Sequence, residues 1–290
     1  KYTHAEYTGY VSASVTRPDD QLEGYELFQS AEHTIDLEGP VGRLVEKMRA
    51  AEGGAALPSG NYPVLFTPNA LSTFFALGNA LNGKPVVEGV STLRDALGQQ
   101  ALSTLLTITD DPTVPGGPQS YPLDDEGIPA SPTPLVQRGV VRGFLFDLRW
   151  GTRHGQGSTG NGLRCGRTQI GAGRGYQNPV VPAPSNMVIE AGDRSIEELV
   201  RSIGRGLIVD SVMGVHTSNP ISGDFSVNMD LALVVENGEV IGRLKDAMLS
   251  GNTFALLKDG LMGLSRERVW HGSSLTPWFL VDGLAVTTAG

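Results

Sequence analysis

Residues 231–244 read LALVVENGEVIGRL, and no other segment of the chain predicts a structure so clearly. Two apolar runs rich in valine and leucine flank the pair Asn237-Gly238. Asn-Gly is a preferred two-residue hairpin turn, because both residues tolerate the positive φ angles that such a turn requires. The segment therefore predicts two antiparallel strands joined by a tight turn.

Other segments along the chain also favour strands, because they are short, apolar and bounded by turn residues. The pair Arg138-Gly139 predicts the turn of a second hairpin. The predicted strands cover residues 5–17, 62–66, 104–109, 135–148 and 278–286.

Helices are predicted where apolar residues recur at helical spacing. The clearest runs from Asp193 to Ile203, because Ser195 and Glu198 have the spacing of a capping box. The others cover residues 40–51, 68–81 and, as a short helix, 91–99. Because the late strands are arranged in hairpins, this order predicts an α+β fold with a largely antiparallel, barrel-like sheet.

The segment GGAALPSGNYP at residues 53–63 is the best candidate for a domain boundary. Its glycines, prolines and small polar residues favour a linker over a helix or a strand. We therefore expect two parts, residues 1–57 and residues 58–290, of which the second is rich in β-structure with a few helices.

The chain has 290 residues, a formal net charge of −9, 38 glycines and one cysteine. The acidic balance and the lack of a Lys/Arg run argue against nucleic-acid binding. No stretch of about 18 apolar residues is present, so no membrane span is expected. KYTHAEYTGY at residues 1–10 lacks a signal pattern. We therefore expect a cytoplasmic protein without an internal disulfide.

The five histidines are scattered along the chain and form no metal-binding motif. HExxH and CxxC are both absent from the sequence, whereas a hydrolytic zinc site needs three close His, Glu, Asp or Cys ligands. A site assembled in the fold from His154, Cys165 and His216 is a minor alternative. We expect no metal and no cofactor in this chain.

Two further patterns suggest chemistry but have a simpler interpretation. GQGSTG at residues 155–160 matches GxGxxG, yet no helical pattern follows it, so a glycine-rich turn is favoured over a nucleotide site. Cys165 has Arg164 and Arg167 beside it, and such basic neighbours would activate a nucleophilic thiol. A structural cysteine is nevertheless the favoured interpretation.

Two polar segments have a functional and an ordinary interpretation. The acid run Asp124, Asp125 and Glu126 suits a metal or a peptide amine, but a solvated loop is favoured. Residues 217–230 read TSNPISGDFSVNMD and are dense in small polar groups. They suit contact with a peptide or a partner strand and an ordinary loop equally well.

Several short motifs, taken together and in order, resemble the C-terminal part of the TldD/PmbA family, once called modulators of DNA gyrase. They are PVLFTPNAL, LLTITDDPTVPGG, DDEGIP, LVQRGVVRGFLFDL, STGNG, SGDFSVNMDLALVVENGEV and SGN at 250–252. The resemblance runs from about residue 5 to the end of the chain. It implies that residues 1–57 are the remainder of an N-terminal α/β domain and that residues 58–290 form the family's β-rich C-terminal domain.

In the TldD type, the resemblance implies a helix with HExxxH. Its histidines bind zinc together with a cysteine near the C-terminus, and its glutamate serves the attacking water. Phe74, Phe75 and Asn79 stand at the His, Glu and His positions of this motif, and VWHGSS, with His271, stands where the cysteine is expected. The resemblance is therefore to the TldE/PmbA type, and zinc is expected only in a TldD-like partner.

This resemblance implies a non-catalytic subunit of a heterodimeric TldD/TldE zinc metalloprotease that acts on unfolded or extended peptides. Family substrates include precursors of modified antibacterial peptides and unstable antitoxins. A homodimer is a possible state when the TldD-like partner is absent. The residues expected to contact the peptide or the partner are Ser158, Thr159, Gly160, Asn161, Ser222, Gly223, Asp224, Phe225 and Ser226.

Two other functions stay open from the sequence. The chain could be a stand-alone hydrolase that uses Cys165 or a non-standard metal site, which metal analysis and cleavage assays of the chain alone would test. It could also be a binding protein that modulates a target such as DNA gyrase without proteolysis. A neighbouring gene that encodes HExxxH would favour the protease subunit over this last function.

Overall fold

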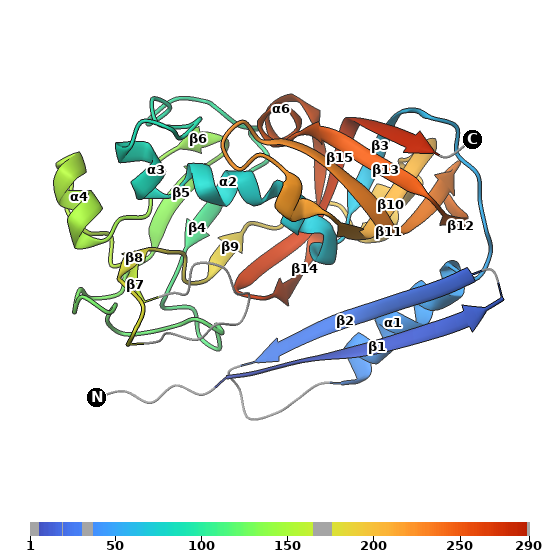
Figure 1. The fold of residues 1–290 in the computed structure, drawn as a ribbon, viewed down its shortest axis with the longest axis horizontal. Coiled ribbons are helices and arrows are strands. Elements are labelled where there is room, and N and C mark those ends of the chain that lie inside the picture. The colour runs from blue at the N-terminus through green and yellow to red at the C-terminus, as the bar shows by residue number, and fades with distance from the viewer. Residues whose placement is uncertain (1–5, 19, 31–36, 165–175, 289–290) are drawn as a thin grey trace.

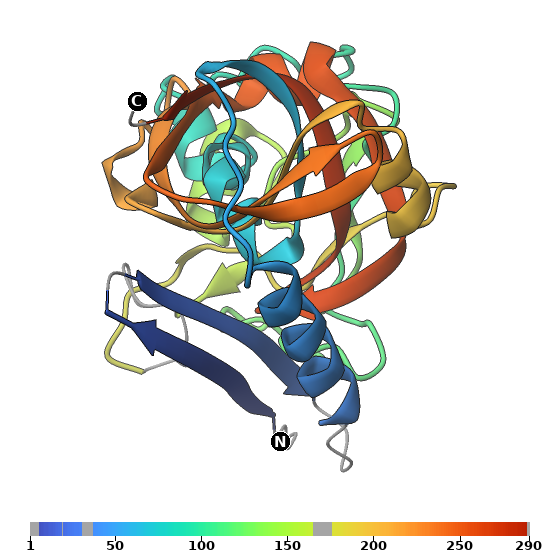
Figure 2. The same cartoon turned by 90° about the vertical axis from the view of Figure 1, so that its right-hand side faces the viewer.

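Five strands close into a barrel at the centre of the molecule (Figures 1 and 2). The computed structural model describes residues 6–18, 20–30, 37–164 and 176–288. The barrel strands are β3 (Gly60–Phe66), β10 (Arg205–Met213), β11 (Asp224–Glu236), β13 (Ala247–Asn252) and β15 (Ser274–Thr288).

Each barrel strand pairs with two others, and this pairing closes the ring. β10 pairs with β11 and β3, β15 pairs with β3 and β13, and β13 pairs back to β11. The contact between β3 and β10 is parallel, and the other four contacts of the ring are antiparallel. The predicted α+β class with a largely antiparallel, barrel-like sheet is therefore confirmed.

The hairpin predicted at residues 231–244 joins β11 to β12 (Glu239–Leu244). Asn237 and Gly238 have φ angles of 51° and 80°, as the predicted turn requires. β11 begins at Asp224, so residues 224–230, for which a contact segment and an ordinary loop suited the sequence equally well, are part of the strand. Their apolar residues alternate with polar ones, and this alternation is the signal that the high polar content concealed.

Burial along β11 shows which faces of the barrel are covered. In the first half, Phe225, Val227 and Met229 point inward and are buried, while the residues between them are exposed. From Leu231 to Val235 every residue is buried. A strand buried on both faces needs cover outside the barrel as well as a core inside it.

One outer face is covered by α5 (Ile196–Arg201). Leu199 and Ile203 pack there on Leu65, Val235 and Leu280 of three barrel strands. The predicted capping box is confirmed, because the Ser195 hydroxyl accepts from the Glu198 N–H and the Glu198 carboxylate accepts from the Ser195 N–H. The helix itself is shorter than the predicted 193–203.

Another outer face is covered by a unit of β1 (Tyr7–Arg17), β2 (Asp20–Ser30) and α1 (Glu38–Ala50), which we call the hairpin–helix unit. Leu44 and Met48 of α1 pack between Leu22 of β2 and the outward-facing Leu231 and Leu233 of the barrel. Figures 1 and 2 show this unit lying along one side of the barrel. The predicted first strand and the predicted helix are confirmed, whereas β2 was not predicted.

The sheet continues beyond the barrel through β15. β14 and β9 both pair with β15, and β4, β5 and β6 follow in order from β9. The remaining elements are η1 (Pro68–Phe74), α2 (Phe75–Ala80), α3 (Gly83–Val87), β4 (Ile108–Asp110), β5 (Thr133–Gln137), β6 (Val140–Val141), α4 (Leu148–His154), β7 (Gly162–Leu163), β8 (Val181–Pro182), β9 (Met187–Ile189), η2 (Val215–Thr217), α6 (Thr253–Ala255), η3 (Leu256–Gly260) and β14 (Leu261–His271).

Three predictions of local structure were wrong or only partly right. Residues 91–99 form turns rather than the predicted helix. The short helix of this region is α3, which the Asn82 side chain caps. The predicted helix 68–81 begins as a 3₁₀ helix, in which the Thr73 hydroxyl donates to the Ala70 carbonyl and competes with the α-helical pattern. The turn at Arg138-Gly139 is confirmed, but the chain after 141 leaves the sheet because Leu145 bonds to the backbone of residues 81–83.

Two other expectations concern the length of one strand and the absence of a membrane-spanning helix. The strand expected at 104–109 is limited to Ile108–Asp110. In the described part of the chain, every helix lacks either the length or the apolar character that crossing a membrane requires.

Gly238→Ala should lower the free energy of unfolding more than Gly283→Ala does. Both glycines have φ near +80°, so alanine is strained at either position, at a cost of about 1 kcal/mol. A Cβ at position 238 would also lie 2.8 Å from Arg201 Cα, whereas a Cβ at 283 would meet nothing within 4 Å. Denaturant midpoints of the two variants give the comparison, and equal losses would contradict it.

Candidate functional site

The helical segment that follows β3 carries the three positions that the resemblance predicts to stand at the zinc motif, and we call them the zinc-motif positions. Phe74, at the end of η1, is buried in the core, where its ring meets the edge of Phe66 at a centroid distance of 4.9 Å. Phe225 and Phe279 flank the same ring at 6.2 and 6.3 Å. Phe75 begins α2 and is 36 % exposed. Position 74 therefore serves the packing of the barrel core.

Asn79 is engaged in a different way. Its side-chain amide donates to the carbonyl of Pro220 at 2.9 Å, and so holds the 218–223 loop against α2. Phenyl rings have no donor atom for a metal, and an amide nitrogen is a hydrogen-bond donor rather than a ligand. The residues at these three positions therefore do not fit a zinc ion. Within residues 6–18, 20–30, 37–164 and 176–288, no three His, Cys, Asp or Glu side chains gather as a metal site.

The 218–223 loop, which precedes β11, is ordered by its own polar groups. Asn219 Oδ1 accepts from the N–H groups of Ile221 and Ser222. The Thr92 hydroxyl donates to the Ile221 carbonyl at 2.6 Å, beside the bond from Asn79. Asn219-Pro220 and Ser222-Gly223 are pairs that favour a turn. No local pattern in the sequence indicates that Thr92 contacts this loop.

The loop ends in a small polar cluster. Asp224 accepts from the Ser222 hydroxyl at 2.7 Å and from the Asn252 amide at 2.8 Å. These two hydrogen bonds, that from Asn252 first, lower the pKa of the Asp224 carboxyl. Asn252 also accepts from the N–H groups of Phe254 and Ala255, and so caps α6. Asp224 therefore stays ionised beside the loop.

The predicted contact residues 222–226 lie next to the zinc-motif positions, but only some of them are accessible. Ser226 and Asp224 are exposed and Ser222 is half-buried. Phe225 is buried in the barrel core, and a Cβ at Gly223 would meet the Phe254 ring at 2.7 Å. Contact with a peptide or a partner would therefore have to use the hydroxyls, the carboxylate and the backbone of this segment.

The other predicted segment, residues 158–161, follows α4 and directs its polar groups inward. The Thr159 hydroxyl accepts from the Phe146 N–H and donates to Asn161 Oδ1. The Ser158 hydroxyl accepts from the Gly160 N–H. Asn161 is buried, and its amide donates to Asp110 at 2.6 Å. The side chains of this segment are thus used within the fold.

The acid run next to this segment is not a solvated loop, so the favoured prediction was wrong. Asp124 is buried and accepts from the N–H groups of Glu126, Ile128 and Gly162. Glu126 accepts from the Leu148 N–H at the start of α4, and Asp125 from the Arg164 N–H. The carboxylates fix distant backbone segments, which a count of local charges could not indicate.

Asp110 lies at the centre of this region and is completely buried. It accepts from the backbone N–H and the hydroxyl of Ser185 at 2.7 and 2.8 Å, and from Asn161. Burial raises the pKa of Asp110 to about 6, although these hydrogen bonds act in the opposite direction.

The histidine and cysteine candidates do not form a site in the described part of the chain. The ring of His154 stacks on Phe146 at a centroid distance of 4.9 Å, and His216 lies exposed in η2. His271 ends β14. Burial lowers the pKa of His271, while the charge of Glu26 raises it and that of Lys47 lowers it. Cys165, and with it the predicted hydrolase and metal sites that use it, lies outside the described residues.

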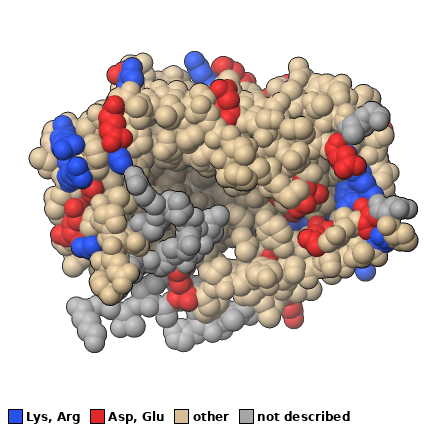
Figure 3. All heavy atoms as spheres, viewed as in Figure 1, with Lys and Arg blue, Asp and Glu red and all other residues tan. Residues whose placement is uncertain are grey.

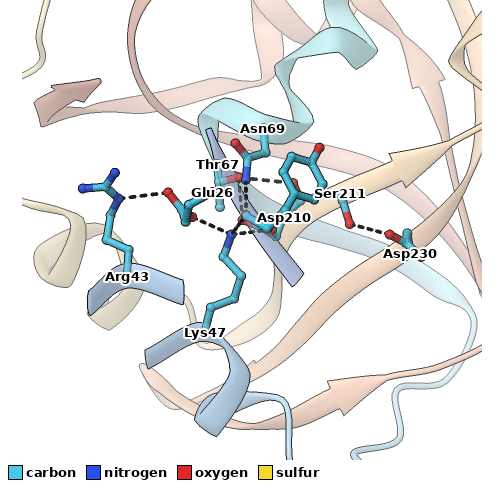
Figure 4. A network of polar contacts seen from close by, with 9 residues as sticks. Glu26, Arg43, Lys47, Thr67, Asn69, Asp210, Ser211 and Asp230 are labelled. Carbon is cyan, nitrogen blue, oxygen red and sulfur yellow. Dashed lines mark hydrogen bonds and ion pairs between the residues drawn. The ribbon is translucent and has the colours of Figure 1, made fainter. Parts of the chain in front are cut away.

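A buried ionic network, not predicted from the sequence, joins the hairpin–helix unit to the barrel (Figure 4). The Lys47 ammonium of α1 contacts Glu26 Oε1 at 2.6 Å, Asp210 Oδ2 at 2.7 Å and the Tyr25 carbonyl at 3.0 Å. Asp210 lies at a register shift in β10. A charged residue within the apolar run GLIVDSVM was the feature of the sequence that could have indicated this network. Burial raises the pKa of Asp210, and Lys47 opposes this effect.

The same network reaches the start of the zinc-motif segment. The Thr67 hydroxyl, one residue before η1, donates to Asp210 Oδ1 at 3.0 Å. Asn69 within η1 donates to the carbonyl of Tyr25. The position of the hairpin–helix unit is therefore linked to the position of η1 and α2.

The family model described as the PmbA/TldA metallopeptidase C-terminal domain matches residues 59–288. The chain belongs to the PmbA/TldD family.

Relatives within the PmbA/TldD family are of several kinds. An uncharacterized protein of Methanocaldococcus jannaschii is 29 % identical over 255 residues, which are 87 % of this chain and 57 % of that protein. A metalloprotease of Methanothermobacter thermautotrophicus is 32 % identical over 204 residues, 70 % of this chain and 42 % of its own. A TldD homologue of Haemophilus influenzae, also named a metalloprotease, is 26 % identical over 205 residues, 70 % of this chain and 40 % of its own.

Solved structures of PmbA/TldD proteins share the fold. TldE from Thermococcus kodakarensis superimposes with a TM-score of 0.86 at 27 % identity, over 97 % of this chain and 63 % of its own. A Thermotoga maritima protein described as a modulator of a DNA gyrase gives 0.82 at 28 % identity, over 97 % and 62 %. The chain spans about half the length of the curated relatives it matches.

Asp110→Asn should change how stability depends on pH. The pKa of Asp110 is about 6 in the fold against 3.8 for an ordinary aspartate, so its stabilising contribution is full below 3.8 and is lost as pH rises through about 6. The loss is on the order of 3 kcal/mol. Unfolding free energies of both proteins across this range test the prediction, and parallel pH curves would contradict it.

Lys47→Met should destabilise the protein by about 3 to 5 kcal/mol, because it leaves buried carboxylates without their cation. The double variant Lys47→Met/Asp210→Asn should lose less, since Glu26 keeps its contact with Arg43. Denaturation measures both losses, and hydrogen exchange should rise first in α1 and β2. A double variant that is less stable than Lys47→Met would contradict this prediction.

Proposed function

We propose that this chain is the non-catalytic, TldE/PmbA-type subunit of a cytoplasmic two-subunit metalloprotease. The observation that carries this proposal is the chemistry of the zinc-motif positions. Phe74 is a core residue, Phe75 has no proton to transfer, and Asn79 donates to Pro220. A relative with HExxxH would supply the zinc and the water-activating glutamate, and this chain would supply none of the three groups.

The proposed substrate is an unfolded or extended peptide, held between the two subunits. An extended peptide is recognised mainly through its backbone, which needs hydrogen-bonding groups at an accessible strand end or loop. Ser222 in the 218–223 loop and Asp224 and Ser226 at the start of β11 offer such groups near α2. Residues 158–161 contribute in this proposal by shaping the neighbouring surface, since their side chains are engaged internally.

Co-purification with an HExxxH paralogue from the same organism tests this proposal. The pair is expected to form a stable complex that cleaves an unstructured peptide, while this chain alone cleaves nothing. Mutating the glutamate of HExxxH in the paralogue should abolish cleavage without dissolving the complex. Cleavage by this chain alone would contradict the proposal, and binding to gyrase without any complex would favour the non-proteolytic alternative.

A matched pair of variants locates the contact in the same assay. Ser222→Ala/Ser226→Ala removes two hydroxyls beside α2 and leaves the buried Phe225 in place. Ser12→Ala/Ser14→Ala removes two hydroxyls from the exposed face of β1. Only the first pair is expected to weaken complex formation or raise KM, and equal behaviour of the two pairs would place the contact elsewhere.

A further inference from the structure

Three cationic side chains converge on one tryptophan at the end of the molecule formed by α3 and α4. The Trp150 ring is buried, and its centroid lies 5.0 Å from Arg153 Cζ, 5.2 Å from Arg149 Cζ and 5.9 Å from Lys84 Nζ. Both arginines are exposed. Figure 3 shows basic side chains gathered over α4, on a surface that is otherwise mainly uncharged or mixed. We call these three residues the α3–α4 cation cluster.

The cluster has little compensating charge in the described part of the chain. Lys84 contacts Glu88 at 4.0 Å, and neither Arg149 nor Arg153 has an ion pair there. Two carboxylates of this region are used by the backbone, and one of them, Asp147, also interacts with the charge of Arg149. Asp147 accepts from the Trp150 N–H, and Glu126 accepts from the Leu148 N–H. The guanidinium groups therefore keep most of their donors for a ligand.

The arrangement is only partly favourable to the helix, because Arg153 lies in the last turn, where a positive charge suits the helix dipole. Arg149 and Arg153 are four residues apart, so their like charges face each other on one side of α4. Arg149 also lies in the first turn, where a positive charge opposes the helix dipole. Stacking on Trp150 offsets part of this cost and holds both guanidinium groups in place. The two guanidinium groups are thus held in position without an ion pair in the described part of the chain, and groups fixed in advance bind an anion at a lower cost in ordering.

The ligand must be anionic, short and compatible with an acidic protein. Guanidinium groups pair with carboxylates through two parallel hydrogen bonds, and two fixed arginines suit two carboxylates in succession. The net charge of −9 would repel a long polyanion such as a nucleic acid outside the cluster. A peptide with two or three acidic residues is short enough to contact the cluster alone, so the acidic surface elsewhere would repel it less.

We infer that the α3–α4 cation cluster is a binding site for an acidic segment of an extended polypeptide. α3 begins at Gly83, three residues after α2 ends at Ala80, so the site lies beside the proposed peptide-contacting surface. The inference goes beyond the proposed function, because binding of an acidic peptide to this chain is measurable whether or not a metalloprotease partner exists.

Fluorescence anisotropy with a labelled hexaglutamate peptide tests the site on the full chain, with a neutral Gly/Ser peptide as reference. Hexaglutamate should bind more tightly, and its affinity should fall as salt rises. Arg149→Gln/Arg153→Gln should weaken hexaglutamate binding roughly threefold to tenfold. Arg149→Lys/Arg153→Lys, which keeps the charge but loses the paired donors, should weaken it less than the glutamine variant does. Glu88→Gln, an exposed change that removes the acid beside Lys84, should tighten it.

The matched control is Arg201→Gln/Arg205→Gln, which changes the net charge by the same amount at arginines already paired with Glu197 and Glu236. This control should bind hexaglutamate like the unmodified chain. Equal binding of the acidic and neutral peptides, or equal weakening by both double variants, would overturn the inference. Tighter binding of a DNA duplex with the same arginine dependence would also overturn it. Glu88→Gln keeps the test valid if the arginine variants fail to fold.

Discussion

Closure of the barrel is the constraint on which the rest of the structure depends. Because the ring has no free edge, β3 is held between β10 and β15 and the chain can leave it only at its end. The Thr67 N–H still bonds to Val209, and η1 begins at the next residue. The segment with the zinc-motif positions therefore starts from a fixed point, and Phe74 enters the core that the ring encloses.

This placement makes core packing and metal binding compete for one position. The Phe74 ring lies among Phe66, Phe225 and Phe279, so a histidine there would put a polar group into an apolar contact. Asn79 lies nearer the surface and anchors the 218–223 loop through Pro220. If these are the HExxxH positions, as the proposed function takes them to be, one serves packing and the other loop anchoring in this chain. The proposed subunit role rests on this use of the two positions.

Local signals in the sequence predicted the local parts of this structure. Asn237-Gly238 and the Ser195–Glu198 pair act within a few residues, and both were predicted correctly. Asp124 and Lys47 could not be read in this way, because their partners lie far along the chain and meet them only in the fold. The strand at residues 224–230 was not predicted, because one of its faces is solvated and carries polar side chains. Asp210, a charge inside an apolar run, was a signal that could have been used.

A zinc measurement on the isolated chain tests the central claim most directly. The purified polypeptide would be incubated with excess zinc, passed through a desalting column, and analysed for metal per chain by mass spectrometry. If Phe74 serves the core and Asn79 serves the 218–223 loop, the zinc retained should be far below one ion per chain. One tightly held ion per chain would contradict the account, because it would require a metal centre that these residues cannot build.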